Sequence, residues 1–335
     1  MSTSKPYYYG GQAVMEGVMM RGRNSMAVGV RHPEGHIVVY EEDLKPGPVL
    51  RRVRNIPFVR GAVVLWDTLL LGMKALMFSA NVGLQEEIEG EEPSEEPSTI
   101  TGPLLWLTVA VSLMFSIALF FVLPLVVIWF LDRWIASDFV SNLIEGGIRL
   151  GILIGYMALI ARVEDIRRVF GYHGAEHMTI NAYEAGVPVD VENVRKHSLT
   201  HIRCGTGFLL IVVLISIFVF ALLGRPPLFW RIASRILLVP FIAAIGYEVI
   251  RFGAAHYGNR LVRWILSPGI ALQRLTTRPP DDSMLEVAIA AFKRVLVRDA
   301  VMSEAELDPA VVTVDNLGKP LNVPVPVALA AEGGP

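Results

Sequence analysis

Charged side chains are scarce in this chain of 335 residues: Asp, Glu, Lys and Arg make up 19% of it, whereas hydrophobic residues make up 53%. Soluble globular proteins carry about 25% charged residues. The composition therefore excludes an ordinary soluble enzyme and indicates extensive contact with a lipid bilayer. The formal net charge of −2 gives no general attraction to phosphate backbones, so we expect no specific nucleic-acid binding.

Cysteine is almost absent as well. Cys204 is the single cysteine of the sequence, which excludes a disulfide within the chain and fits a reducing compartment or a metal ligand. The N-terminal stretch also lacks an apolar run of signal-peptide length. We therefore expect no cleaved signal peptide and insertion through internal spans.

Long apolar runs, in contrast, occur four times. The longest holds no charge over 28 positions, and about 20 residues suffice to cross the hydrocarbon core. We predict transmembrane helices 1 and 2 within residues 100–161 and helices 3 and 4 within residues 206–250. The runs themselves cover residues 104–131, 143–161, 206–223 and 232–250. The predicted fold class is a mainly α polytopic membrane protein with about four transmembrane helices.

Two segments at the start of the chain have their own patterns. Residues 1–57 form an N-terminal segment in which apolar residues alternate on both sides of a Pro-x-Gly turn, and this predicts a β-hairpin over residues 26–42. Residues 58–84 are apolar but carry Asp67 and Lys74 on one helical face. That pattern favours an amphipathic or interfacial helix and leaves a fifth span open.

Two further segments are predicted from composition and periodicity. Residues 85–99 hold seven glutamates and two prolines, a composition typical of a flexible acidic linker. In the C-terminal region, residues 251–335, apolar residues recur at helical spacing and predict an amphipathic helix that begins near Ser283.

The distribution of lysine and arginine predicts the orientation. These residues are numerous before the first span, in the loop of residues 162–205 and in the C-terminal region, whereas the loop after the first span has only Arg133. Because loops rich in positive charge stay inside, we expect a multi-pass protein of the inner (plasma) membrane. Both termini and the 162–205 loop would lie in the cytoplasm.

The 162–205 loop contains four of the seven histidines of the chain. His173 and His177 are four residues apart, so on a helix they share one face and can hold one metal ion. Glu176 stands between them in the pattern H-x-x-E-H, the inverted zinc-protease motif. The spacing predicts a metal site in which Glu176 reaches a metal-bound water.

A second group of possible ligands follows in the same loop. His201 and Cys204 offer imidazole and thiolate, the ligands that zinc prefers, and His197 lies one helical turn before His201. A turn at residues 185–188 would fold two ligand-bearing helices onto each other. Because Cys204 directly precedes the third span, the sequence predicts a divalent metal site, with Zn2+ as the favoured ion, at the cytoplasmic membrane surface.

Three interpretations of this cluster are open on sequence alone. A catalytic site would use three protein ligands and a water, with Glu176 as the general base. A structural site would use four protein ligands, His173, His177, His201 and Cys204, and would catalyse nothing. Alternatively, the histidines are surface residues that contact lipid headgroups.

Glu248 lies near the end of the fourth predicted span, and an ionisable group at membrane depth is a candidate functional residue. One interpretation is that it reaches the interface or pairs with Arg251, three residues later. The other is that it serves the metal site as a further ligand or proton acceptor.

Four blocks of the sequence carry a resemblance to a known family: GGQAVMEGVMMRG at residues 10–22, YHGAEHMTI at 172–180, HIRCGTGF at 201–208 and PGIALQRLTT at 268–277. Together they resemble the YqhQ-like bacterial membrane proteins, a family of unknown function described as predicted metal-dependent enzymes. The resemblance implies that five residues stand at the positions of the family's proposed metal motif: His173, Glu176, His177, His201 and Cys204.

These observations favour a zinc-dependent hydrolase-like membrane protein that acts on a membrane-associated peptide or a lipid-linked substrate. A second hypothesis is a non-catalytic factor for membrane-protein biogenesis or assembly, with a structural metal and with the translocon or the ribosome as partner. A third is an ion transporter, for which the few charged residues inside the predicted spans offer only a thin pathway.

Overall fold

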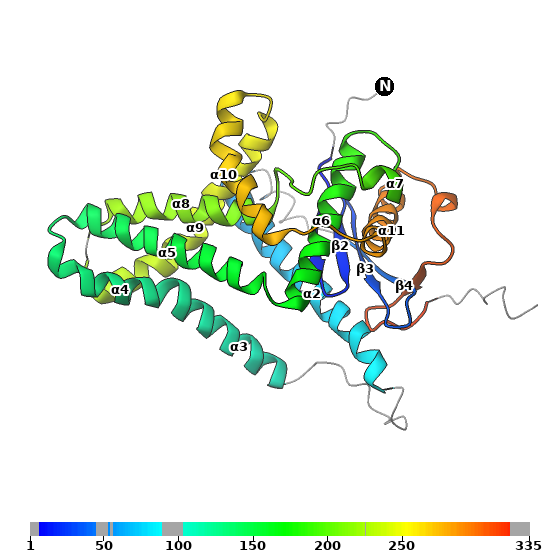
Figure 1. Cartoon of the computed structure of the whole chain (residues 1–335), viewed down its shortest axis with the longest axis horizontal. Helices are drawn as coiled ribbons and strands as arrows, with labels where there is room; N and C mark the ends of the chain where they lie inside the picture. Colours follow the sequence, from blue (N-terminus) through cyan, green and yellow to red (C-terminus); the bar gives the residue numbers. More distant parts are fainter. Residues whose placement is uncertain (1–6, 45–52, 54–55, 89–102, 225, 322–335) are drawn as a thin grey trace, which may run out of the picture.

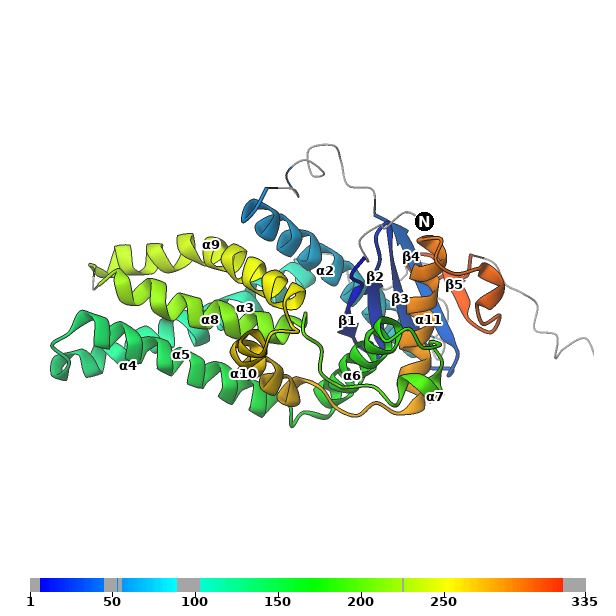
Figure 2. The same ribbon diagram turned by 90° about the horizontal axis from the view of Figure 1, so that it is seen from above.

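The computed structural model describes residues 7–44, 53, 56–88, 103–224 and 226–321. Two parts lie end to end: an elongated helical bundle, and a β-sheet with helices on its faces, which we call the sheet domain (Figures 1 and 2). The chain is mostly helical, as predicted, and its small sheet comes mainly from the N-terminal segment.

The four predicted spans are all helices. The first span is long and is divided into α3 (Pro103–Ile117), the π-helical turn η1 (Ala118–Val122) and α4 (Leu123–Leu131). A 3₁₀ turn, η2 (Asp132–Trp134), leads to the second span, α5 (Asp138–Ile160). The third and fourth spans are α8 (Gly205–Leu222) and α9 (Leu228–Ala255). Within the described residues, five helices are long and apolar enough to cross a membrane, since Val59–Leu84 meets the same criteria.

The bundle consists of two helical hairpins. The turn between α4 and α5 and the turn between α8 and α9 both lie at the end of the bundle that is far from the sheet domain (Figure 1). The C-terminal end of α5 and the N-terminal end of α8 are therefore directed toward the sheet domain. The segments that connect to the sheet domain leave from this one end of the bundle.

The π-helical turn has an identifiable cause. Pro124 has no N–H, so the carbonyl of Phe120, four residues earlier, loses its normal helical donor. Arg149 Nε of α5 donates to this carbonyl at 3.1 Å. The proline therefore produces a local change of helix type whose orphaned acceptor is satisfied by the neighbouring helix.

Glu145 of α5 is the common partner of three arginines. Its carboxylate accepts hydrogen bonds from Arg149 at 2.9 Å and from Arg235 at 3.0 Å, and it lies 3.4 Å from Arg231 Nη2. All four side chains are buried. Charges inside a low-dielectric bundle must be paired, so this cluster ties α5 to α9.

The sheet has the strand order β1-β2-β3-β4-β5. The first four strands form an antiparallel meander, and the last pairs parallel to β4: β1 (Gly10–Val14), β2 (Gly17–Arg21), β3 (Ser25–Arg31), β4 (Ile37–Asp43) and β5 (Val312–Val314). The hairpin predicted over residues 26–42 is confirmed as β3 and β4. The β1–β2 hairpin and the addition of β5 were not predicted.

Helices cover both faces of this sheet. α6 (Glu164–Glu184) and α11 (Asp282–Arg298) pack on the face that carries Val18 and Met20. The second half of α2 (Val59–Ile88) packs on the opposite face, which carries Met19 and Val28. This division follows from the strand repeat, in which successive side chains point to opposite faces. α11, capped by the Asp281 side chain, is the amphipathic helix expected near Ser283.

α2 confirms the helix predicted over residues 58–84 but is longer. It continues to Ile88, so residues 85–88 of the expected acidic linker are helical and the predicted boundary was wrong. Residues 89–99 of that linker lie outside the described residues.

The polar residues of α2 contact the sheet. Asp67 forms an ion pair with Arg21 of β2, and Lys74 pairs with Glu42 of β4 at 2.7 Å. The two residues predicted to share one helical face thus dock this helix onto the strands.

The region predicted as the 162–205 loop is mostly ordered secondary structure. α6 carries the first histidine pair as predicted, and the turn at residues 185–188 is confirmed, with Gly186 at φ +73°. The prediction of a second ligand-bearing helix was wrong: α7 spans only Val191–Val194, and His201 and Cys204 follow in a non-helical segment. α10 (Arg260–Thr276) and the 3₁₀ turn η3 (Glu304–Glu306) were not predicted.

Candidate metal centre

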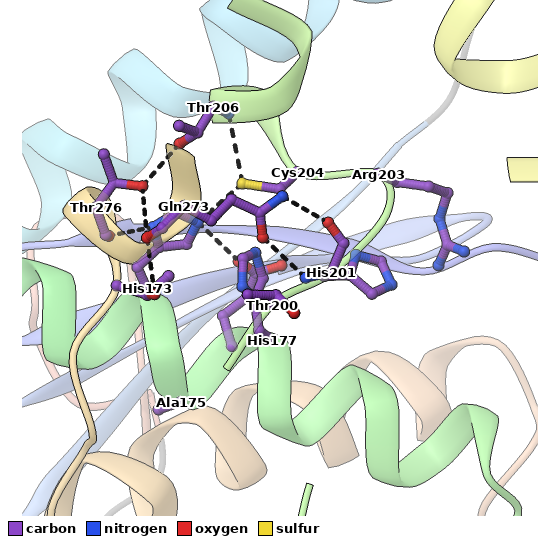
Figure 3. A network of polar contacts seen from close by, with 12 residues as sticks. His173, Ala175, His177, Thr200, His201, Arg203, Cys204, Thr206, Gln273 and Thr276 are labelled. Carbon is purple, nitrogen blue, oxygen red and sulfur yellow. Dashed lines mark hydrogen bonds and ion pairs between the residues drawn. The ribbon is translucent and has the colours of Figure 1, made fainter. Parts of the chain in front are cut away.

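α6 brings His173 and His177 together as their spacing predicts. The two residues are one helical turn apart, and their ring centroids lie 4.4 Å from each other. His177 is 1% exposed, so its imidazole is enclosed by protein. The pair lies where α6 meets the start of α8 and the end of α10 (Figure 3).

Backbone carbonyls fix the tautomer of both imidazoles. His173 Nδ1 lies 2.8 Å from the carbonyl oxygen of Thr276, and His177 Nδ1 lies 2.6 Å from that of Leu199. A carbonyl oxygen can only accept, so each Nδ1 carries the proton and donates it. In the neutral rings, each Nε2 is left with a free lone pair, the arrangement typical of metal-ligating histidines.

Three glycines allow this close packing. A Cβ at Gly174 would lie 2.3 Å from the carbonyl oxygen of Arg278, so only glycine lets the chain after α10 approach α6 here. Arg278 N also donates to the carbonyl of Phe170 at 2.8 Å. Gly207 of α8 and Gly269 of α10 likewise bring those two helices together, because a Cβ at Gly269 would lie 3.2 Å from Gly207 Cα.

Cys204 completes a group of three possible ligands. It caps the N-terminus of α8, where its Sγ accepts from Thr206 N at 3.4 Å. The same Sγ lies 3.3 Å from His173 Nε2. One ligand atom from each of His173, His177 and Cys204 lies within 4.8 Å of the others, so these three side chains could bind one ion.

Glu176 lies against this group. Its Oε2 is 4.0 Å from His173 Nε2 and 3.8 Å from His177 Nε2, and the residue is 4% exposed. Gly11 of β1 makes room for it, since a Cβ there would lie 2.7 Å from Glu176 Cγ. The carboxylate is thus held between the imidazoles and the first strand.

His201 is not brought into this group of three. Its ring centroid is 5.7 Å from that of His177, and its Nε2 lies 3.7 Å from Glu184 Oε2. Burial alone would raise the pKa of Glu184, but the neighbouring His201 and Arg203 outweigh it and lower that pKa to about 2. In His197, the other histidine of the segment, Nδ1 lies 3.1 Å from the backbone carbonyl oxygen of Asn193.

Two residues that the sequence analysis did not single out hold the site together. Gln273 of α10 accepts from His201 N and donates to His201 O, both at 2.9 Å, and is 1% exposed. Thr276 supplies the carbonyl for His173, and its hydroxyl lies 3.0 Å from that of Thr206 (Figure 3). Both belong to the block PGIALQRLTT, so this block is the feature of the sequence that could have identified them.

Glu248 lies on α9 and has a different partner from the one expected. Arg60 Nε of α2 donates to its Oε1 at 2.7 Å, and Phe58 N donates to the same oxygen at 3.2 Å. Pairing with Arg251 was therefore wrong as the main contact. The carboxylate fastens the start of α2 to the bundle and lies outside the group of three ligands.

A second group of possible ligands lies in the β3–β4 turn. His32, Glu34 and His36 have ligand atoms within 4.8 Å of one another, and Glu34 is exposed. Burial and the neighbouring His32 lower the pKa of His36, against the opposing effect of Glu34. A cavity of about 440 Å³ also involves His36 in its lining, but it contains none of the residues around Cys204.

Fold and site together define a class: a helical membrane protein in which a His–His–Cys group and a glutamate lie where the sheet domain meets the helical bundle. The chain belongs to the family described as "Protein of unknown function (DUF1385)", which matches residues 56–298. It is 34% identical over 309 residues to "Uncharacterized protein YqhQ" of Bacillus subtilis (strain 168), covering 91% of this chain and 97% of that protein. The resemblance to the YqhQ-like proteins is thereby confirmed. No solved structure matches the chain.

We predict that Gln273 controls access to Cys204. Gln273→Leu would leave the buried N–H and carbonyl of His201 without partners, at a cost of about 1–3 kcal/mol. Since 1.4 kcal/mol is a factor of about ten, we expect local opening to increase at least ~5-fold. The measurement is the rate of Cys204 alkylation by N-ethylmaleimide in the purified protein.

The matched control is Arg274→Ala, at the exposed neighbouring position. It should leave the alkylation rate within about twofold of wild type, because exposed substitutions usually change stability by less than ~0.5 kcal/mol. Equal rates in wild type and Gln273→Leu would contradict the prediction that Gln273 controls access to Cys204.

Proposed function

We propose that this protein is a metal-dependent hydrolase, with zinc as the favoured ion, whose site lies at the junction of the membrane bundle and the sheet domain. One observation carries the proposal: His173, His177 and Cys204 converge while the buried Glu176 lies within 4.0 Å of both Nε2 atoms. The three side chains would be the ligands, and Glu176 would be the general base.

The residues fit a zinc ion on chemical and geometric grounds. Two neutral imidazoles and one thiolate are preferred zinc ligands, and the atoms bound to one tetrahedral zinc lie roughly 3.4 Å apart. The separation of 3.3 Å between Cys204 Sγ and His173 Nε2 agrees with this value. The carbonyl partners of both Nδ1 atoms support the fit, because they keep the Nε2 lone pairs available.

Three ligands instead of four favour catalysis. A structural zinc site is closed by four protein ligands, whereas a catalytic site leaves a position for water. His201 would be the fourth ligand, but it lies outside the group of three: its ring centroid is 5.7 Å from that of His177, and its Nε2 lies 3.7 Å from Glu184 Oε2. When bound, zinc supplies Lewis-acid chemistry and lowers the pKa of its water toward ~7. Glu176 would accept a proton at Oε2 and return it to the leaving group.

We also propose that four helices cross the membrane and that α2 does not. In its second half, Leu71, Phe78 and Val82 are buried against the sheet. The part before Leu71 has 12 residues, or about 18 Å of helix, which is shorter than the ~30 Å hydrocarbon core. With four spans, both hairpins open toward the sheet domain, and the distribution of basic residues supports a cytoplasmic position for that domain and both termini.

The first prediction concerns orientation. In intact cells, Asp138→Cys and Pro227→Cys, in the two turns far from the sheet domain, should react with a membrane-impermeant maleimide. Glu192→Cys, on the exposed surface of α7, should react only after lysis. Wild type measures the background from the buried Cys204. Labelling of positions 138 and 227 only after lysis would reverse the orientation.

The second prediction concerns metal content. Purified wild type, stripped with chelator and reloaded with zinc, should retain about one ion per chain, because its ligands are preorganised. His173→Ala/His177→Ala should retain almost none by elemental analysis. A double variant of two histidines outside the group, His197→Ala/His256→Ala, is the control and should match wild type. Equal, substoichiometric zinc in all three proteins would eliminate the site.

The third prediction separates chemistry from metal binding. Glu176→Gln keeps the size of the side chain but removes the base, so zinc content and melting temperature should persist. Function, measured by complementation of a deletion strain, should be lost, since a general base contributes typically ~10²–10⁴-fold. His177→Ala should lose both zinc and function. Full complementation by Glu176→Gln beside failure of His177→Ala would instead support a structural metal and an assembly factor.

A further inference from the structure

The first strand of the sheet lies next to Glu176 and is an edge strand. β1 pairs with β2 on one side, and it ends the strand order of the five-stranded sheet. An edge strand presents alternate N–H and C=O groups that a further strand can bind.

The hydrogen bonds between β2 and β3 determine which backbone groups of β1 point away from the sheet. Arg31 N donates to Glu16 O, and Gly22 N donates to Ser25 O, both at 2.8 Å. Even-numbered residues of β2 therefore bond to β3, and the odd-numbered ones bond to β1. In the β1–β2 register the odd-numbered residues of β2 face Gly10, Gln12 and Val14. The backbone groups of Gly11 and Ala13 consequently point away from the sheet.

The neighbours of these two residues on the same edge already have partners. The carbonyl of Tyr9 accepts from Arg203 at 3.3 Å, and the carbonyl of Met15 accepts from Ser79 at 2.6 Å. Between them, the N–H and C=O groups of Gly11 and Ala13 have no hydrogen-bond partner in the part of the chain that the structure describes. Both residues are partly exposed.

This stretch of edge also touches the candidate site. Gly11 lies directly against Glu176, as the distance of 2.7 Å from a Cβ at Gly11 to Glu176 Cγ indicates. At Gly10 a Cβ would meet nothing within 4 Å, so the strand is open there. A chain bound along Gly11 and Ala13 would therefore pass beside the general base.

We propose that the outer edge of β1 binds an extended peptide segment as an added strand, and that this segment is the substrate of the hydrolase. The inference builds on the proposed function and narrows its substrate class to peptides. In the reaction, the peptide C–N bond breaks, the hydroxyl of water joins the carbonyl carbon, and the proton taken by Glu176 passes to the amine nitrogen. The products are a carboxylate and an amine.

The available groups favour a peptide as occupant. Gly11 and Ala13 offer donors and acceptors at the repeat of a β-strand, and strand addition uses the same repeat in the ligand backbone. A phosphate headgroup has no donors to offer the two carbonyls. A second copy of this chain, paired through its own β1, is the competing occupant, and oligomeric state tests it.

The experiment uses the purified full-length chain in detergent micelles and a fluorescent peptide, Lys-Val-Thr-Val-Thr-Val-Lys, followed by anisotropy. The Glu176→Gln background prevents loss of the probe by cleavage. Ala13→Pro removes one outward N–H without breaking the β1–β2 ladder, since proline is tolerated on the free side of an edge strand. We expect it to weaken peptide binding roughly 10-fold, because one carbonyl of the probe loses its donor. Ala13→Ser keeps the N–H and should bind within about twofold of the background protein.

A probe N-methylated at its three central residues should fail to bind, because it cannot form the strand hydrogen bonds. Melting temperature and zinc content of Ala13→Pro must match those of Ala13→Ser, which separates lost binding from lost folding. Equal binding by Ala13→Pro and Ala13→Ser, or no binding to the Glu176→Gln background, would overturn the proposal. So would a dimer in the parent protein that Ala13→Pro converts to a monomer without any peptide binding.

The two proposals can fail separately. Zinc retention and loss of function in Glu176→Gln without peptide binding would leave the hydrolase and remove the β1 site. Peptide binding that depends on the N–H of Ala13, in a protein that retains no zinc, would leave a peptide-binding edge and remove the hydrolase.

Discussion

The hydrogen bonds from the two imidazoles to backbone carbonyls are the interactions on which the candidate site depends. They fix the proton on Nδ1 of His173 and His177 and leave both Nε2 atoms beside Cys204 and Glu176. The two carbonyls belong to Leu199 and Thr276, on segments far from α6 in the sequence. Any loosening of these segments would free the rings to rotate, so the geometry of the candidate site depends on packing between three distant parts of the chain.

The membrane bundle provides that packing. α6 begins four residues after α5 ends, and Cys204 directly precedes α8, so the distance between the ligands depends on how α5 and α8 pack. Gly146 allows this contact to be close, because a Cβ there would lie 2.4 Å from Ile217 Cγ1. The buried cluster around Glu145 holds α5 against α9 in addition. The bundle thus controls the geometry of the candidate site through the ends of its helices.

Local pattern predicted the parts of this protein that depend on neighbours in sequence. The four apolar runs, the hairpin over residues 26–42 and the helical spacing of His173 and His177 were correct for that reason. The role of Gln273 and the position of the His201 ring were not predictable. The first arises from contact between α10 and the segment before α8, and the second from the approach of that segment to Glu184 at the end of α6. The same holds for Glu248, whose partner Arg60 is 188 residues away and not on the next helical turn.

Burial and access have to be reconciled at a site where Glu176, the proposed general base, is 4% exposed. Burial strengthens electrostatic interactions and excludes competing water, but it also closes most directions of approach. α6 carries the two histidines from one side, and α8, which begins after Cys204, packs closely on α10 through Gly207 and Gly269 on the other. The first strand is different, because its glycines leave no side chain beside Glu176 and its outward backbone groups are not used by the sheet. The glycine at position 11 brings the strand backbone against Glu176, so in the proposed peptide site recognition and chemistry would use the same few residues.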